Sequence, residues 1–148
     1  MTYQNVYEQW IQHSLYQEEL QAILNDTQEI EDRFYQQVPF GTGGMRGLLG
    51  AGTNRINTHT IRLVAEGLAR QIETQGEIAK MRGVVIAYDT RHYSQHFAYE
   101  TAGVLAAHDQ FRSACGRRDG RVRGPRSVRV CRLSGGSLDN TGETRVGR

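Results

Sequence analysis

The chain has 148 residues, which is enough for one domain with a hydrophobic core and too few for several. Its net charge of +2 combines a net charge of −4 over residues 1–108 with a net charge of +6 over residues 109–148, where ten arginines face four acids. No stretch approaches the roughly 20 apolar residues of a membrane span, the first residues lack signal-peptide features, and the two cysteines lack zinc-site spacing, so we expect a soluble, reducing, cytoplasmic setting.

Apolar periodicity and capping residues predict two helices in the first part of the chain. Apolar residues recur at helical spacing from Tyr3 and predict one packing helix that continues to Leu24. Asp26 and Glu29 have the spacing of a capping box, which predicts a second, short helix that ends before Pro39. The inward side of this second helix carries Ile30 and Phe34.

The segment 40–47, Phe-Gly-Thr-Gly-Gly-Met-Arg-Gly, is the candidate functional site. Its four glycines permit a sharp turn and leave backbone N–H groups free to converge on an anion. Thr42 adds a hydroxyl, and Arg46 adds a fixed positive charge whose planar donors suit phosphate. A nucleotide P-loop would need Gly-Lys-Ser/Thr here, and a dinucleotide fingerprint would need glycine in place of Arg46. A purely structural hairpin and an oxyanion cradle both stay open, and Arg46 favours the cradle.

Beyond the glycine segment, helices and strands alternate. Residues 48–54 indicate a hairpin arm or an extended turn. The clearest helix of the chain begins at Asn57 or Thr58 and ends near Gly76. A continuous apolar run at residues 84–88 then predicts a strand that is buried on both faces. This alternation predicts a parallel α/β layer fold.

Asp89 and Arg91 directly follow the predicted strand 84–88. They would lie at the carboxyl end of that strand, which is where open parallel sheets hold ligands. Alternatively, they brace the turn by pairing with the backbone and with each other, and both interpretations stay open. Ser94 can cap the helix that follows, which ends near His108.

After His108 this alternation stops. Another buried strand should follow, because one strand cannot form a parallel sheet. Residues 109–148 instead are rich in arginine and glycine. Val128, Val130 and Leu133 have the spacing of one short strand, and the rest is predicted to be disordered or to come from an out-of-frame or unrelated sequence.

Three stretches together resemble the N-terminal domain of the α-D-phosphohexomutase family, the phosphoglucomutases and phosphomannomutases. They are the segment 40–47, the pair Asn57-Thr58 with its helix, and the segment 86–98, which begins Ile-Ala-Tyr-Asp-Thr-Arg-His. The two leading helices resemble the branch of bacterial phosphoglucomutases and phosphopentomutases. The resemblance extends over about residues 3–108.

The resemblance also implies a division of the chain. Residues 1–38 would form an N-terminal helical extension. Residues 39–108 would form an incomplete three-layer α/β/α domain 1, in the α/β class, and residues 109–148 the basic tail. In this arrangement two helices precede the domain and a disordered tail follows it. The domain itself would lack part of its sheet.

The resemblance implies an isomerase of carbohydrate metabolism. Such an enzyme, an intramolecular phosphotransferase, interconverts hexose 1-phosphate and hexose 6-phosphate through a phosphoserine and a bisphosphate intermediate. Its substrate is a sugar phosphate, and Mg²⁺ and a hexose bisphosphate activator are implied as cofactors. Arg46 would be the catalytic residue that faces the phosphate, with Thr42 and Gly43 also binding substrate. The residues implied to be structural near the site are Asp89, Arg91 and Ser94.

The sequence also departs from this family. The serine loop, typically Thr-Ala-Ser-His-Asn-Pro, and the Asp-Gly-Asp-x-Asp-Arg magnesium loop are absent, so we expect no metal ligands and a truncated chain that is inactive alone. One alternative is a non-catalytic module that binds phosphate or sugar phosphate. Another is nucleic-acid binding by the arginine-rich tail, which the lack of interleaved aromatic residues disfavours. We expect no membrane partner, and the sequence sets neither the sugar nor the oligomeric state.

Overall fold

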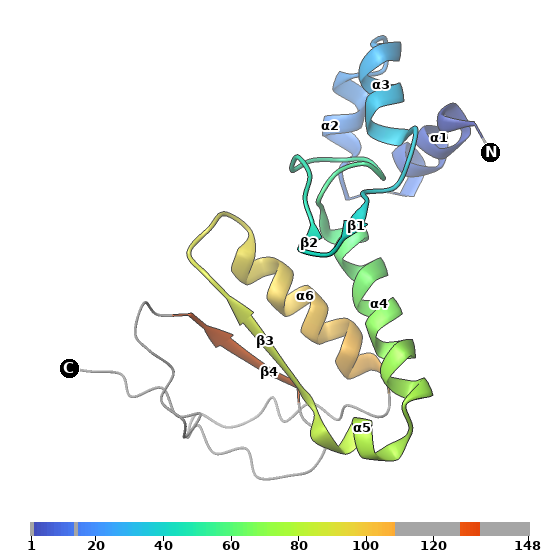
Figure 1. Ribbon diagram of the computed structural model, residues 1–148. Coiled ribbons are helices and arrows are strands. Elements are labelled where there is room, and N and C mark those ends of the chain that lie inside the picture. The colour runs from blue at the N-terminus through green and yellow to red at the C-terminus, as the bar shows by residue number, and fades with distance from the viewer. Residues whose placement is uncertain (1, 14, 109–127, 134–148) are drawn as a thin grey trace. The chain divides into compact units, whose positions relative to one another are not determined.

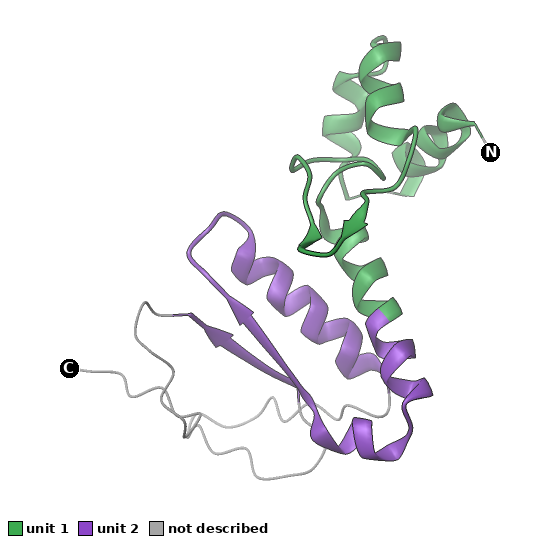
Figure 2. Cartoon of the chain, viewed as in Figure 1, with its two compact units in different colours: residues 1–67 green, residues 68–148 purple. Residues whose placement is uncertain are grey.

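The computed structural model describes residues 2–13, 15–108 and 128–133. The chain divides into two compact units, residues 1–67 and 68–148, which are shown in different colours in Figure 2. The elements in chain order (Figure 1) are α1 (Tyr3–His13), α2 (Gln17–Ala22), α3 (Thr27–Phe34), β1 (Phe40–Gly41), β2 (Gly44–Met45), α4 (Thr58–Thr74), α5 (Glu77–Arg82), β3 (Val84–Tyr88), α6 (Ser94–Ala107) and β4 (Val128–Arg132).

Three helices, α1 to α3, lead the chain where apolar periodicity predicts two. The helix predicted from Tyr3 to Leu24 breaks near Tyr16, and α2 packs against α1. In one straight helix Tyr7 and Leu20 would lie about 20 Å apart. Instead, the Tyr7 hydroxyl donates a 2.9 Å hydrogen bond to the Leu20 carbonyl, and both side chains are buried in one core. Burial of this apolar surface favours two packed helices over one long helix.

Helix α3 begins where its capping residues predict. The Asp26 carboxylate accepts a hydrogen bond of 3.0 Å from the Glu29 backbone N–H, as an N-cap does. The Glu29 carboxylate does not return to the cap, because it accepts a 2.7 Å hydrogen bond from Arg33 Nε. Ile30 and Phe34 are buried in the core of the first unit, as predicted.

Asn57 caps helix α4, in agreement with the sequence. Its Oδ1 accepts a 3.0 Å hydrogen bond from the Thr60 backbone N–H. Its Nδ2 donates to the Gly50 and Gly52 carbonyls at 2.9 and 2.8 Å, and the residue is only 1% exposed. Asn57 therefore fastens the loop before α4 as well as the first turn of the helix.

In the second unit, β3 and β4 form a two-stranded parallel sheet in which Val84 lies opposite Val128. Helix α6 packs along this sheet (Figure 1), and Leu105, Ala69 and Val84 share a small core. The strand at 84–88 is confirmed. Its predicted burial on both faces is wrong for the described residues, since Val85 is 69% exposed. Side chains alternate along a strand, and α6 covers only one of the two faces.

The structure tests only part of the predictions for residues 109–148, because it describes only residues 128–133 of this segment. Strand β4 confirms the short strand predicted at Val128. The predicted disorder and the nucleic-acid-binding tail concern mainly residues 109–127 and 134–148, which lie outside the described residues. The mixture of helices and a small parallel sheet agrees with the α/β class, and the three-layer arrangement stays a prediction.

None of the described helices combines the length and the hydropathy that crossing a bilayer requires.

Candidate functional site

The glycine segment 40–47 forms a tight antiparallel hairpin. Its two short strands pair residue by residue: Phe40 with Met45, and Gly41 with Gly44. A two-residue turn, Thr42-Gly43, joins the strands and is exposed. Gly44 has a φ of +88°, a left-handed conformation that glycine adopts without strain. The hairpin is confirmed, and whether it can also hold an anion depends on the position of Arg46.

The Arg46 guanidinium lies over the turn of the hairpin. A Cβ atom placed on Gly43 would lie 3.2 Å from Arg46 Nη2, so the guanidinium occupies the space beside this glycine. Arg46 is exposed, and within the described part of the chain no side chain or carbonyl forms an ion pair or hydrogen bond with its guanidinium. A fixed positive charge beside bare backbone, with no acid paired to it in the described part of the chain, is suited to an anion.

Both ends of the hairpin are fastened by hydrogen bonds of residues 48–56, a segment that includes the hairpin arm or extended turn predicted at residues 48–54. The Val38 N–H, just before β1, donates a 2.9 Å hydrogen bond to the Thr53 carbonyl. After β2, the Leu48 carbonyl accepts a 2.8 Å hydrogen bond from the Ile56 N–H. The position of Arg46 therefore depends on this extended turn.

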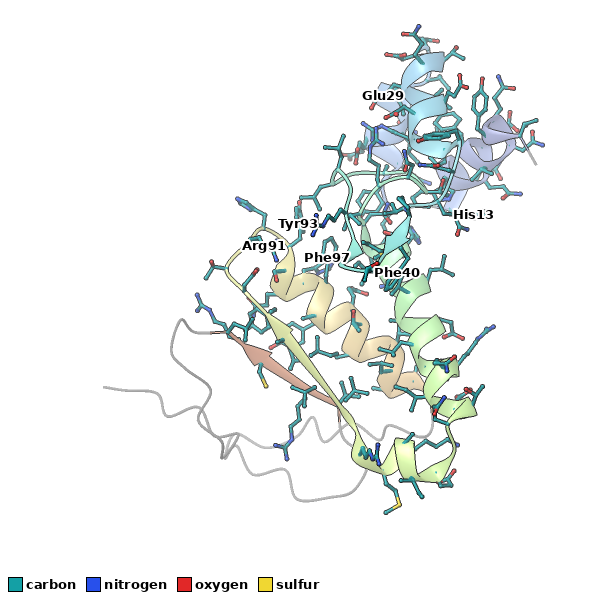
Figure 3. The ribbon with its side chains drawn as sticks, viewed as in Figure 1. His13, Glu29, Phe40, Arg91, Tyr93 and Phe97 are labelled. Atoms are coloured by element: carbon teal, nitrogen blue, oxygen red, sulfur yellow. The ribbon has the colours of Figure 1, made fainter. Side chains whose placement is uncertain are left out.

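An apolar groove of about 510 Å³ lies along the hairpin in the first unit. Phe40, which is labelled in Figure 3, and Met45 line it from the hairpin. Trp10 of α1 and Leu63 of α4 line other parts of the wall. The remaining lining residues are Gln37, Val38, Thr53, His59, Thr60 and Val64. Arg46 does not line this groove, so the groove and the guanidinium are separate features of the hairpin.

His59 lies in the wall of this groove, close to two aromatic rings. Its ring centroid lies 4.8 Å from that of Trp10 and 6.1 Å from that of Tyr16. Its Nε2 is buried and has no hydrogen-bond partner among the described residues. Burial, followed by the positive charge of Arg62, lowers the pKa of His59 below its ordinary value of 6.5. The sequence does not single out His59, because a lone histidine in an apolar helix forms no motif.

We predict that the chain loses stability as the pH falls below the ordinary histidine pKa. The unfolded chain then binds a proton at His59 that the folded chain does not bind, so the free energy of unfolding decreases. Thermal melts at about pH 7.5 and about pH 5.5 should show a smaller decrease for the His59→Phe variant than for the unmodified chain. The exposed His13 provides a control, since His13→Phe should retain the full decrease. A full decrease in His59→Phe would assign the effect to other groups.

Asp89, Arg91 and Ser94 meet in the loop after β3, where Figure 3 labels Arg91 and Tyr93. The Asp89 carboxylate accepts hydrogen bonds from the Arg91 backbone N–H at 3.1 Å and from Arg91 Nε at 2.7 Å. The first of these is the main cause that lowers the pKa of Asp89. Ser94 is not the predicted cap of α6, because its Oγ accepts the Asp89 N–H at 3.1 Å and Tyr93 is the N-cap. That these residues lie near the phosphate site stays a prediction.

No cluster of three or more His, Cys, Asp or Glu side chains within the described residues could hold a metal ion. The described residues therefore do not fit the Mg²⁺ that the family resemblance implies.

A family model and several curated proteins each match about half of the chain. A family model described as "Phosphoglucomutase/phosphomannomutase, alpha/beta/alpha domain I" matches residues 37–112. Two curated relatives, phosphoglucomutases of Staphylococcus aureus strains bovine RF122 / ET3-1 and USA300, are 44% identical over 80 and 82 residues. The aligned part is 54% of this chain but only 14% of each relative. No solved structure matches significantly. The family resemblance predicted from the three motifs is confirmed.

Proposed function

Because the chain belongs to the phosphoglucomutase/phosphomannomutase family, we propose that its hairpin holds the phosphoryl group of a sugar phosphate. The observation that carries this proposal is the exposed Arg46 guanidinium beside Gly43, which has no ion-pair partner among the described residues. Arginine can donate two parallel N–H bonds to phosphate oxygens, and the absence of a Cβ atom at Gly43 leaves room for the guanidinium beside the turn. The Thr42 hydroxyl, at the exposed turn, supplies a further donor.

The chemistry of phosphoryl transfer explains why such a group is useful. Charge spreads over the oxygens of the transferring group in the transition state, and a fixed cation stabilises it without reorganising. In a complete mutase, which interconverts hexose 1-phosphate and hexose 6-phosphate in the cytoplasm with Mg²⁺, we assign this role to the arginine at the position of Arg46. The proposal includes a three-layer domain, and it places no Mg²⁺ ligand in these 148 residues. These 148 residues contain no serine loop of the family's type, so we propose that this chain binds without turnover.

Calorimetry with glucose 1-phosphate tests the proposal. Arg46→Ala should weaken binding about 10- to 100-fold, because a hydrogen bond to a charged group contributes about 1.5–3 kcal/mol. Arg82→Ala removes an exposed arginine from the second unit and should leave the affinity unchanged. Equal affinities for the unmodified chain and Arg46→Ala would contradict the proposal. A coupled assay on the same chain should detect no glucose 6-phosphate.

A further inference from the structure

We propose that Glu19 of α2 and Arg33 of α3 are positioning residues that hold the phosphate hairpin in place. The inference rests on the proposed function, since the position of the hairpin matters for binding only if the hairpin binds phosphate. Neither side chain lies in the glycine segment, and each acts through the extended turn that supports it.

The two side chains bind both backbone polar groups of one buried residue, Ala51. Glu19 Oε1 accepts a 3.1 Å hydrogen bond from the Ala51 N–H, and Arg33 Nη1 donates a 3.2 Å hydrogen bond to the Ala51 carbonyl. The same oxygen and nitrogen form an ion pair with each other. Glu29, labelled on α3 in Figure 3, accepts a further hydrogen bond from Arg33 Nε. Because Ala51 is fully buried, these side chains supply partners that water cannot supply.

Two glycines let the backbone approach these helices closely. A Cβ atom on Gly50 would lie 2.7 Å from Glu19 Oε1, and one on Gly52 would lie 2.7 Å from the Arg33 carbonyl oxygen. Real Cβ atoms essentially never make contacts shorter than 3.0 Å. A side chain at position 52 would therefore meet the backbone of α3, and one at position 50 would displace the Glu19 carboxylate that binds Ala51.

The bound loop holds both ends of the hairpin. On one side, the Thr53 carbonyl accepts the hydrogen bond from Val38, which lies two residues before β1. On the other side, Ile56 donates to Leu48, which lies two residues after Arg46. A shift of residues 50–52 away from α2 and α3 would therefore move both ends of the hairpin, and the guanidinium with them.

The ion pair between Glu19 and Arg33 is partly buried, so its loss should affect the position of residues 50–52. The Arg33 side chain is 15% exposed and that of Glu19 is 38% exposed. Burial opposes the charge of Arg33, but hydrogen bonds and attraction to Glu19 and Glu29 outweigh it and raise the pKa of Arg33. Removing one partner of such a pair weakens a structure more than removing one partner of a fully exposed pair.

Hydrogen exchange on the full chain, without ligand, tests this inference. Glu19→Gln keeps the size of the side chain and an acceptor for Ala51, and it removes the charge. We expect the Val38 and Ile56 amides to exchange about tenfold faster, while amides in the middle of α4 keep their rates. Glu77→Gln removes the acid from the Lys80 ion pair of the second unit and should leave Val38 and Ile56 unchanged.

Selective acceleration at Val38 and Ile56 would support the inference. Unchanged rates, or equal acceleration in α4, would overturn it, because the pair would then have no effect or only a general stabilising one. If Glu19→Gln does not fold, Arg33→Lys is judged by the same criterion, and failure of both variants to fold also overturns it. Inorganic phosphate is titrated afterwards into the same variants. Absence of any phosphate binding would contradict the proposed function. The exchange rates would then still show whether Glu19 and Arg33 hold the hairpin in place.

Discussion

Replacing Asn57 with alanine is expected to lower the free energy of unfolding by about 3 kcal/mol. Loss of the N-cap of α4 accounts for about 1 kcal/mol of this decrease. The rest arises because the Gly50 and Gly52 carbonyls lose the donor that satisfies them in a buried loop. Urea unfolding followed by circular dichroism would measure the change.

The exposed Asn25 provides a matched control for this substitution. Asn25→Ala should change the free energy of unfolding by no more than about 0.5 kcal/mol, as is usual for a surface position. Asn57→Ser should recover about 1 kcal/mol relative to Asn57→Ala, because serine is also a good N-cap. If Asn57→Ala destabilises no more than Asn25→Ala, Asn57 does not fasten the loop.

Gly52→Ala is expected to destabilise the chain by about 3 kcal/mol or more. Gly52 has a φ of +129°, a backbone conformation that residues other than glycine rarely adopt. Forcing alanine into this conformation alone lowers the free energy of unfolding by about 1–3 kcal/mol. The added methyl group would also meet the Arg33 carbonyl oxygen at 2.7 Å, and the backbone of α3 or of the loop would have to move. The same urea unfolding experiment would detect the loss.

The same substitution at Gly67 should have the opposite sign. Gly67 lies within α4, and apart from its chain neighbours and the nearby backbone of α4, no heavy atom of the described residues lies within 4 Å of the position of an added Cβ. Gly67→Ala should therefore stabilise the chain by about 0.5–1 kcal/mol through the helix propensity of alanine. Equal destabilisation by both substitutions would argue against close contact between Gly52 and α3.

Local signals in the sequence are sufficient to predict some helices and strands of the fold. The limits of β3 follow from its continuous apolar run, and the starts of α3 and α4 follow from the capping residues Asp26 and Asn57. The break between α1 and α2 could not be predicted in this way. It depends on packing between Tyr7 and Leu20, which periodicity within one helix does not reveal.

The candidate site, too, could be predicted only in part from the sequence. Its four glycines and Arg46 predict the tight turn and its positive charge, because both are properties of the segment itself. Glu19 and Arg33 could not be identified, since each looks like an ordinary surface charge in its own helix. Their contacts with Ala51 join residues 32 and 18 positions apart, and only the fold brings them together. His59 was missed for a similar reason, because its surroundings come from α1 and from Tyr16.

The most direct measurement of phosphate binding follows the backbone amide resonances of the full chain during titration with inorganic phosphate. We expect the Gly43 and Gly44 amides to shift and to saturate, because the bound anion would lie beside Arg46 at this turn. Arg46→Ala should abolish these shifts. Resonances of residues 40–47 that do not move, or that move equally in Arg46→Ala, would contradict a phosphate site at the hairpin.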